Sequence, residues 1–549
     1  MRRREFLQVA TLGGPTLAAV GLSSCAGETA RRRIVAKNTS ASFALNEVTI
    51  SDLQADMQSG RRTARAITEL YLDRIEKIDK HGPSLASVIE LNPEALEIAD
   101  RMDQERWQGR VRGPLHGIPV LLKDNIGTAD RMSTTAGSLA LEGFIAPQDS
   151  CVVSRLRAAG AVLLGKTNLS EWANFRSTRS TSGWSGRGGQ THNPYALDRN
   201  PSGSSSGSAV AVSANLCAVA LGTETDGSIV SPSSVNGIVG IKPTVGLVSR
   251  SGIVPGSHRQ DTAGPLARTV RDAAVLLGVL AGVDHRDAET NSSEGKTHAD
   301  YSRFLDPGGM KGARLGVARA FFGFHDQVDK LMEEALAVMK DLGATLVDPA
   351  DLETVRDSAT MLTCDNAELE ACSYELKADI NAYLAATGRN AAVHSLQDLI
   401  EFNEAHRERE MPYFGQELFT TAQKKGGLSS PEYIQVVEKV RRLSREDGID
   451  ATLSKYQLDA LLAPTEGPAW LTDWINGDHF LGHGSCAPAA RAGYPSVTVP
   501  AGFVHGLPVG VLFFSRAFSE PLLLRLAYAF EQATRQRRPP QFLARTTLA

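Results

Sequence analysis

The sequence has no pattern of metal ligands or disulfide-forming residues. Its 549 residues include six cysteines, with no CxxC pair and no Cys/His spacing of the kind that zinc sites use. Neither a disulfide framework nor a zinc site is therefore supported, and we expect no metal and no other cofactor. Apart from Cys25, the cysteines are expected to be free and buried.

An excess of one charge and a long apolar run are also missing. The formal net charge is −4, which gives no reason to expect a nucleic-acid partner. The apolar run Val9–Leu22 is shorter than the roughly 20 residues that a membrane-spanning helix needs. A hydrophobic content of 42% without low-complexity stretches indicates a globular chain with a large core.

The N-terminus has the pattern of an export signal. The string RRREFLQ begins at Arg2 and precedes the apolar run, and it resembles a twin-arginine signal. Leu22–Cys25 resembles a bacterial lipobox, in which the cysteine is lipidated. We expect residues 1–25 to form the signal and residues 26–45 a tether. The protein would then be exported to the periplasm or cell envelope, with the lipid on Cys25 as its only membrane contact.

From Gly117 onward, short apolar runs alternate with helical patterns, which indicates an α/β fold with a mixed or largely parallel sheet. We predict strands at 118–122, 161–164, 238–241, 314–317, 460–462, 496–499 and 509–514.

Several helix starts can be predicted from capping residues. Ser51 with Gln54, and Asn168 with Glu171, fit the capping box. The small-residue stretch 209–221 is expected to be a helix packed inside the core. Residues 366–450 are charged and strongly helical, with Ser430 as N-cap before Pro431, and we interpret them as a helical insertion.

Residues 201–232 contain the main candidates for catalytic residues. Two Gly/Ser clusters flank an apolar stretch of helix length. A Gly/Ser turn beside a helix exposes backbone N–H groups that suit an anion or an oxyanion. Acyl transfer needs such a site together with a nucleophile, so these clusters indicate a serine-dependent acyl-transfer enzyme.

The segments GSSSGS and GTETDGSIVSP resemble the signature of the amidase signature family. GIPVLLKDNI, VLLGKTNLSEWA, DTAGPLART and AGYPSVTVPAG also resemble motifs of that family, and the resemblance runs from about residue 46 to about 535. The stretch SGWSGRGGQTHNPYALDRNPSGSSSGS is similar to the bacterial peptide amidase branch. The resemblance implies one amidase domain over residues 46–549, with a mixed central β-sheet covered by helices on both faces.

The same resemblance implies a Ser-Ser-Lys triad. Lys123 corresponds to the basic residue, Ser204 to the bridging serine after a cis Gly203–Ser204 bond, and Ser228 to the nucleophile. Burial at a strand end would lower the pKa of Lys123, so that the neutral amine can accept a proton from Ser204. The N–H groups of the oxyanion hole are expected from Thr225, Asp226, Gly227 and Ser228, and Ser205 is expected to contact the substrate.

The predicted reaction is hydrolysis of a carboxamide, either a small molecule or a peptide amide, by a monomer or homodimer. Asp226 and Val230 depart from the general family pattern, which has Gly and often Arg at these positions. Because that Arg holds a substrate carboxylate in some relatives, a small acidic amide is not favoured. Two alternatives remain, namely the amidase subunit of a tRNA-dependent amidotransferase and a non-catalytic envelope lipoprotein that binds a ligand.

Other motif matches are weaker. Gly203–Gly207 fits the G-x-S-x-G nucleophile elbow, but no strand pattern precedes it. Ser293–Lys296 fits S-x-x-K within a polar loop and is interpreted as chance. His192 is the histidine nearest in sequence to the Ser clusters, and we expect it to be structural.

Overall fold

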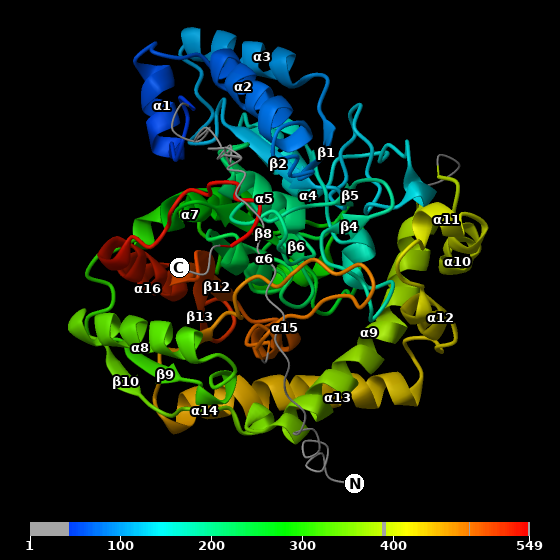
Figure 1. Ribbon diagram of the computed structural model, residues 1–549, viewed down its shortest axis with the longest axis vertical. Helices are drawn as coiled ribbons and strands as arrows, with labels where there is room; N and C mark the ends of the chain where they lie inside the picture. The colour runs from blue at the N-terminus through cyan, green and yellow to red at the C-terminus, as the bar shows by residue number, and fades with distance from the viewer. Residues whose placement is uncertain (1–42, 387–390, 483, 547–549) are drawn as a thin grey trace, which may run out of the picture. The chain divides into compact units, whose positions relative to one another are not determined.

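The computed structural model describes residues 43–386, 391–482 and 484–546 (Figure 1). The predicted export signal, Cys25 and the tether up to residue 42 lie outside these residues. Among the residues that the structure describes, no helix has both the length and the apolar character needed to cross a membrane.

The centre of the fold is an 11-stranded mixed sheet with the strand order β1-β3-β2-β6-β8-β7-β12-β13-β11-β9-β10. The pairs β2/β3, β2/β6, β9/β11 and β9/β10 are parallel, and the other neighbours are antiparallel. The strands are β1 Val88–Leu91, β2 Pro119–Lys123, β3 Val162–Thr167, β6 Val219–Glu224, β7 Val239–Lys242, β8 Thr262–Ala267, β9 Arg314–Val317, β10 Thr345–Val347, β11 Ala460–Pro464, β12 Ser496–Val504 and β13 Leu507–Phe514, with a separate hairpin of β4 Trp184–Ser185 and β5 Gly189–Gln190.

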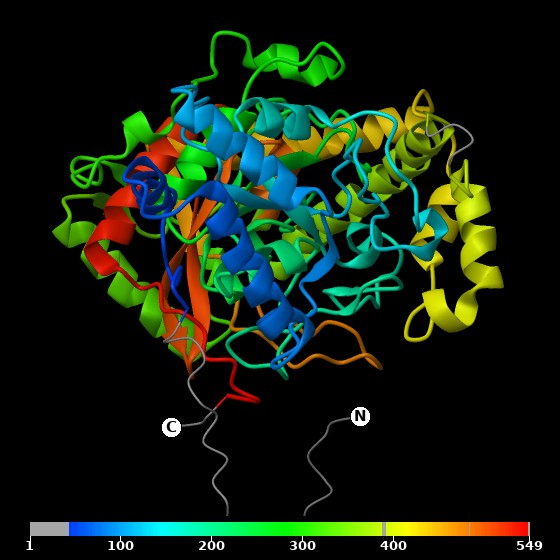
Figure 2. The ribbon, with the colours of Figure 1, turned by 90° about the horizontal axis from the view of Figure 1, so that it is seen from above.

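Helices cover both faces of this sheet. On β13, Val511 and Phe513 belong to the large apolar cluster that includes side chains of α8 and α16, whereas Leu512 and Phe514 pack with α6 and α15. This is the alternation expected for a strand buried on both sides, and Figure 2 shows helices on either side of β12 and β13. The predicted fold class is thus confirmed. The helices are α1 Ile50–Gln58, α2 Ala64–Arg74, α3 Ala95–Trp107, α4 Cys151–Ala158, α5 Ser206–Ser213, α6 Val230–Val235, α7 Val270–Leu280, α8 Asp326–Asp341, α9 Ser358–Ala386, α10 Leu396–Ala405, α11 Arg407–Glu410, α12 Glu417–Gln423, α13 Pro431–Ser444, α14 Asp450–Lys455, α15 Ala487–Ala492 and α16 Glu520–Thr534.

All seven predicted strands are present, as β2, β3, β7, β9, β11, β12 and β13. The prediction of one helix over 209–221 is wrong. Helix α5 ends at Ser213, Asn215 adopts a left-handed conformation with φ 58°, and the chain continues as strand β6. From a short apolar run of small residues, a buried helix cannot be distinguished from a buried strand.

Both predicted capping boxes are wrong. Helix α1 starts two residues earlier, because Thr49 and Asp52 cap each other, and the Gln54 amide instead donates to backbone carbonyls of Pro114 and His116. The short 3₁₀ helix Glu171–Asn174 follows Ser170 as N-cap. The Asn168 side chain is used in tertiary hydrogen bonds, including one from its Nδ2 to Thr191 Oγ1 at 3.0 Å. These long-range partners compete with local capping and are invisible in the sequence.

The described residues of 358–455 are mostly helical and contain helices α9 to α14. Helix α13 begins at Pro431 with Ser430 as N-cap, as predicted. Helices α9 and α13 pack side by side (Figure 1). The interpretation of 366–450 as an insertion stays a prediction.

Candidate active site

Lys123 is the last residue of β2, and its side chain is completely buried. The apolar residues before it place the strand in the centre of the sheet, so the lysine projects from the strand end into the protein. Its Nζ lies 2.7 Å from Ser204 Oγ, 2.8 Å from Thr223 Oγ1 and 3.1 Å from the Thr223 carbonyl oxygen. Asn125 Nδ2 donates to the same Thr223 hydroxyl at 2.9 Å.

The electrostatic environment of Lys123 favours a neutral amine. Burial lowers its pKa to about 7, while Asp261 and Glu224 act in the opposite direction and limit the shift. Desolvation penalises the ammonium form, which has no carboxylate in direct contact to compensate for lost water. A large fraction of Lys123 is therefore able to accept a proton near neutral pH.

Ser204 follows a cis peptide bond from Gly203, as predicted. Its side chain is buried, and its carbonyl accepts the N–H of Ser170 at 3.1 Å. Gly203 has no room for a side chain, because a Cβ there would clash with Ser170 Oγ. The local packing thus requires glycine before Ser204 and holds the serine hydroxyl against Lys123.

The next serine, Ser205, holds the backbone of β6. Its hydroxyl donates to the Thr223 carbonyl at 3.0 Å and accepts the Thr223 N–H at 3.2 Å. The predicted contact of Ser205 with substrate stays a prediction. The contacts indicate that Ser205 fixes Thr223, which in turn contacts the Lys123 amine.

Ser228 lies in a turn that the carboxylate of Glu224 organises. This carboxylate accepts the N–H groups of Gly227, Ile229 and Val230 at 2.9, 2.7 and 3.1 Å. The N–H of Ser205 donates to the Ser228 carbonyl at 3.1 Å, so the two Gly/Ser clusters are joined through their backbones. Ser228 is 8% exposed, unlike the fully buried Ser204.

The predicted Lys–Ser–Ser chain is present in its first link. Among the described residues, no hydrogen bond joins Ser204 Oγ to Ser228 Oγ, and the two serines are connected only through the backbone bond of Ser205. A shift of the Ser228 side chain is needed to complete the chain, which fits the observation that catalytic hydrogen bonds often tighten only when substrate binds.

The four N–H groups predicted for the oxyanion hole divide into two kinds. That of Gly227 is occupied by Glu224. In the described part of the chain, those of Thr225, Asp226 and Ser228 have no hydrogen-bond partner. Gly227 itself has φ 76°, a conformation that a side chain would strain. Three of the four predicted donors are therefore available to an oxyanion, while the backbone conformation of Gly227 shapes the turn.

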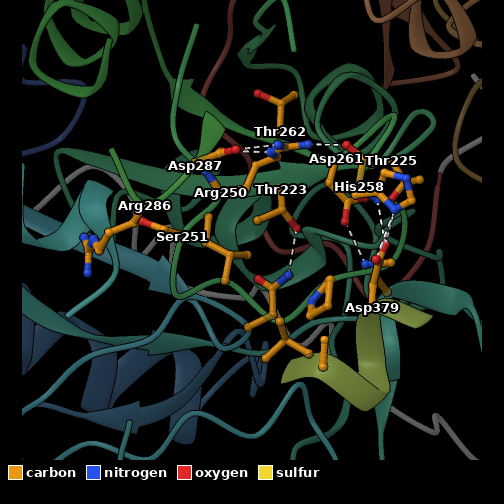
Figure 3. Close-up of a pocket in the computed structure, with 17 residues that line it drawn as sticks. Thr223, Thr225, Arg250, Ser251, His258, Asp261, Thr262, Arg286, Asp287 and Asp379 are labelled. Carbon is orange, nitrogen blue, oxygen red and sulfur yellow. Dashed lines mark hydrogen bonds and ion pairs between the residues drawn. The ribbon is translucent and has the colours of Figure 1, made fainter. Parts of the chain in front are cut away.

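A cavity of about 390 Å³ opens beside this turn (Figure 3). Its lining includes Thr223, Thr225 and Asn125 together with the apolar residues Ile253 and Val254. Charged pairs also line the cavity, namely Arg250 with Asp287 and His258 with Asp379. Its position makes it the candidate substrate pocket.

Sequence reasoning missed Thr223, Asn125 and Asp261, although all three lie in or next to the motifs. Asp261 accepts the Thr225 hydroxyl at 2.6 Å. The antiparallel pairing of Glu224 with Thr262 places Thr225 and Asp261 opposite each other. The motif DTAGPLART directly after Gln260 was the available signal, but the pairing partner is set by the sheet.

The structure also shows the surroundings of Val230 and His192. Val230 is fully buried in the apolar cluster around α15. His192 is half-buried, and its Nδ1 lies 3.0 Å from the Leu197 carbonyl oxygen. Among the described residues, no hydrogen bond links the His192 ring to Ser204 or Ser228.

Comparison with known proteins gives consistent matches over most of the chain. The family model for amidases matches residues 66–524. The native peptide amidase of Stenotrophomonas maltophilia has a TM-score of 0.86 and 51% sequence identity, with 91% of this chain and 99% of that chain covered. A probable amidase of Arabidopsis thaliana is 42% identical over 510 residues, which are 92% of this chain and 93% of the relative. A glutamyl-tRNA(Gln) amidotransferase subunit from Methanosarcina barkeri is 36% identical over 492 residues, 87% of this chain and 96% of the relative. The protein belongs to the amidase signature family and is an amidase-family enzyme.

Proposed function

We propose that this protein hydrolyses carboxamide bonds, with peptide C-terminal amides as the preferred class, through an acyl-enzyme on Ser228. The observation that carries the proposal is the 2.7 Å contact between Lys123 Nζ and Ser204 Oγ, in a site where burial lowers the pKa of Lys123 to about 7. A lysine amine that is neutral near pH 7 is the general base that a serine relay without histidine requires.

The proposed reaction proceeds in two halves. Neutral Lys123 takes the hydroxyl proton of Ser204, and Ser204 takes that of Ser228, whose Oγ forms a bond to the amide carbon. The carbonyl oxygen becomes an oxyanion, stabilised by the N–H groups of Thr225, Asp226 and Ser228. The C–N bond then breaks as Ser204 returns a proton to the leaving amine. Water hydrolyses the ester through the same relay and regenerates Ser228.

The substrate class rests on similarity and on one substitution. The chain is 51% identical to a native peptide amidase and 51% identical to a peptide amidase that was crystallised with the competitive inhibitor chymostatin. Val230 lies in an apolar cluster where an arginine would bind a substrate carboxylate in some relatives. An amide with an apolar or peptide acyl part fits the mixed lining of the cavity better than a small acidic amide.

The amidotransferase alternative has less support. The relative of that kind is 36% identical, and the sequence begins with an export pattern, whereas aminoacyl-tRNA modification takes place in the cytosol. We propose instead that the protein is exported and that Cys25 carries a lipid that anchors it in the cell envelope. Mass spectrometry of the native N-terminus tests this, because an intact Met1 would contradict it.

A hydrolysis screen tests the function. Purified protein without its signal is incubated with peptide amides, acyl anilides and dicarboxylic monoamides, and the released amine is measured. Wild type should act on peptide amides and be inhibited by chymostatin, and Ser228→Ala should lose activity by a factor of about 10⁴ or more. Ser292→Ala, which changes an exposed serine of the short 3₁₀ helix Ala288–Ser293, is the control. A serine-reactive phosphonate that labels a residue other than Ser228 would overturn the assignment.

A further inference from the structure

The loop of residues 256–261, here named the bridging loop, lies between the oxyanion turn and helix α9. On one side, Asp261 and Gln260 hold Thr225. Asp261 Oδ1 accepts the Thr225 hydroxyl at 2.6 Å, and Gln260 Nε2 donates to the Thr225 carbonyl at 3.3 Å. Thr225 is therefore held both through its side chain and through its backbone.

On the other side, the bridging loop is bonded to one face of α9. Glu368, Glu375 and Asp379 recur at spacings of seven and four residues, which places them on the same helix face. Gln260 Nε2 donates to Glu368 at 2.6 Å, and Asp379 accepts the N–H of His258 at 2.8 Å. The carboxylate of Glu375 is fully buried and accepts from Arg259 Nε at 3.0 Å and from the Ser257 hydroxyl.

The bridging loop also has an internal brace. The second carboxylate oxygen of Asp261 accepts the N–H groups of Gly256 and Ser257 at 2.7 and 2.9 Å. One carboxylate thus closes the loop on itself and fixes the Thr225 hydroxyl. A continuous series of hydrogen bonds runs from α9 through this carboxylate to the residue that supplies a proposed oxyanion donor.

We propose that Asp261 is a positioning residue for the oxyanion hole, and that the acidic face of α9 is the platform that holds it. This inference rests on the proposed function of the Thr225 N–H and extends it to Asp261, the first residue of DTAGPLART, and to the face of α9 that supports the bridging loop. Oxyanion stabilisation depends on donors that already point at the developing charge. Thr225 follows directly on β6, so its N–H direction is set by the strand on one side and by the bridging loop on the other.

The test compares substitutions on both sides of the Asp261–Thr225 bond. Thr225→Val keeps the shape and the backbone N–H but removes the hydroxyl, and Asp261→Ala removes the acceptor. Each should lower kcat by about 10- to 100-fold, less than or equal to the loss of a whole oxyanion donor, with KM changed less than threefold. On the alkaline plateau, where the charge of Asp261 no longer affects the protonation of Lys123, both substitutions act through one bond. The double variant should therefore be no slower there than the slower single variant.

Conservative variants separate positioning from general damage. Thr225→Ser keeps the hydroxyl, and Asp261→Asn can donate from its amide to Thr225 Oγ1 while its oxygen accepts the loop N–H groups, so both should recover most of the lost kcat. Asp103→Ala is the matched control, because Asp103 is buried and accepts two backbone N–H groups, from Ala64 and Arg65, near α2. It should lower the melting temperature and leave kcat unchanged.

The rate of Ser228 labelling by a fluorophosphonate, whose phosphoryl oxygen occupies the oxyanion position, should fall in parallel with kcat. If Thr225→Val keeps kcat within twofold of wild type, or if the two single losses multiply in the double variant, Asp261 does not act through Thr225. A loss confined to KM would show that Asp261 binds substrate directly and would also overturn the proposal. Failure of the proposed function is a different result, in which wild type itself neither hydrolyses amides nor is labelled at Ser228.

Discussion

The Gly/Ser segment 201–232 and the helical segment 358–455 contribute to the candidate active site in different ways. In the first, nearly every residue is buried, and the work is done by hydroxyls and backbone N–H groups held at short range. In the second, some charged side chains face solvent, and others make contacts with residues distant in sequence, such as that of Glu375 with Arg259. We therefore expect substitutions to be harmful at most positions of the first segment, but in the second only at a few residues of one helix face.

This difference explains which roles can be read from sequence. A hydroxyl or N–H that acts through its own turn leaves a compact motif. A carboxylate on α9 that acts through a loop more than 100 residues away leaves only a helical pattern. The following substitutions test the contrast, beginning with the largest expected effect.

Lys123→Met should have the largest effect among the residues that support Ser228. Methionine fills similar space but cannot accept a proton, so kcat should fall by several powers of ten while the fold is kept. For wild type, kcat/KM should rise with pH, with a midpoint near 7, because the lysine pKa lies at about 7 and the neutral form is active. A variant that keeps near-normal kcat would show that another group is the base.

The difference in folding stability between wild type and Lys123→Met should also depend on pH. In the unfolded chain Lys123 has a pKa of ~10.4, and in the folded protein its pKa is lowered to about 7. Between these values the unfolded chain binds more protons, so this group makes the folded state more stable as pH rises from about 7 to about 10 and less stable as pH falls. Relative to Lys123→Met, wild type should gain on the order of a few kcal/mol over that range in denaturant unfolding.

The position of Lys123 and its contact with Ser204 were predictable, whereas its contact with Thr223 was not. An apolar run followed by lysine indicates a strand end, and the family motif assigns the residue, but burial of Nζ between Ser204 and Thr223 depends on β2 lying beside β6. Strand β6 was itself predicted as part of a helix. Asp261 could not be assigned, because its contact with Thr225 follows from the β6/β8 register, which local sequence does not determine.

Thr223→Val should have an intermediate effect. It removes the hydroxyl that contacts Lys123 Nζ at 2.8 Å and Asn125 Nδ2 at 2.9 Å, with little change of shape. Because that oxygen stabilises the ammonium form, the midpoint of the pH–kcat/KM profile should move to lower pH, and kcat on the plateau should fall by about tenfold as the amine loses its orientation. An unchanged midpoint would show that the Thr223 hydroxyl does not influence the protonation of Lys123.

Glu375→Gln should have a smaller effect on activity but a clear effect on stability. The substitution leaves the Arg259 guanidinium without its carboxylate, and two of its nitrogens are buried without a hydrogen-bond partner. Loss of one member of a buried pair costs about 3 kcal/mol or more, which denaturant unfolding would measure. We expect kcat to fall only a few-fold, because Asp261 still holds Thr225. Glu370→Gln, on the partly exposed side of α9, is the control and should change neither quantity.

His192→Ala should have the smallest effect and thereby separates the lysine relay from a histidine mechanism. The ring is half-buried, and its Nδ1 makes one hydrogen-bond contact, with the Leu197 carbonyl oxygen at 3.0 Å. Burial lowers the pKa of His192, which favours the neutral ring. Loss of one such hydrogen bond costs about 1 kcal/mol, and the His192 N–H to the Leu85 carbonyl remains. Steady-state kinetics should give kcat within twofold of wild type and the same pH midpoint. A hundredfold loss of kcat would mean that His192 takes part in proton transfer. The catalytic groups would then not be confined to Lys123 and the Gly/Ser segment 201–232.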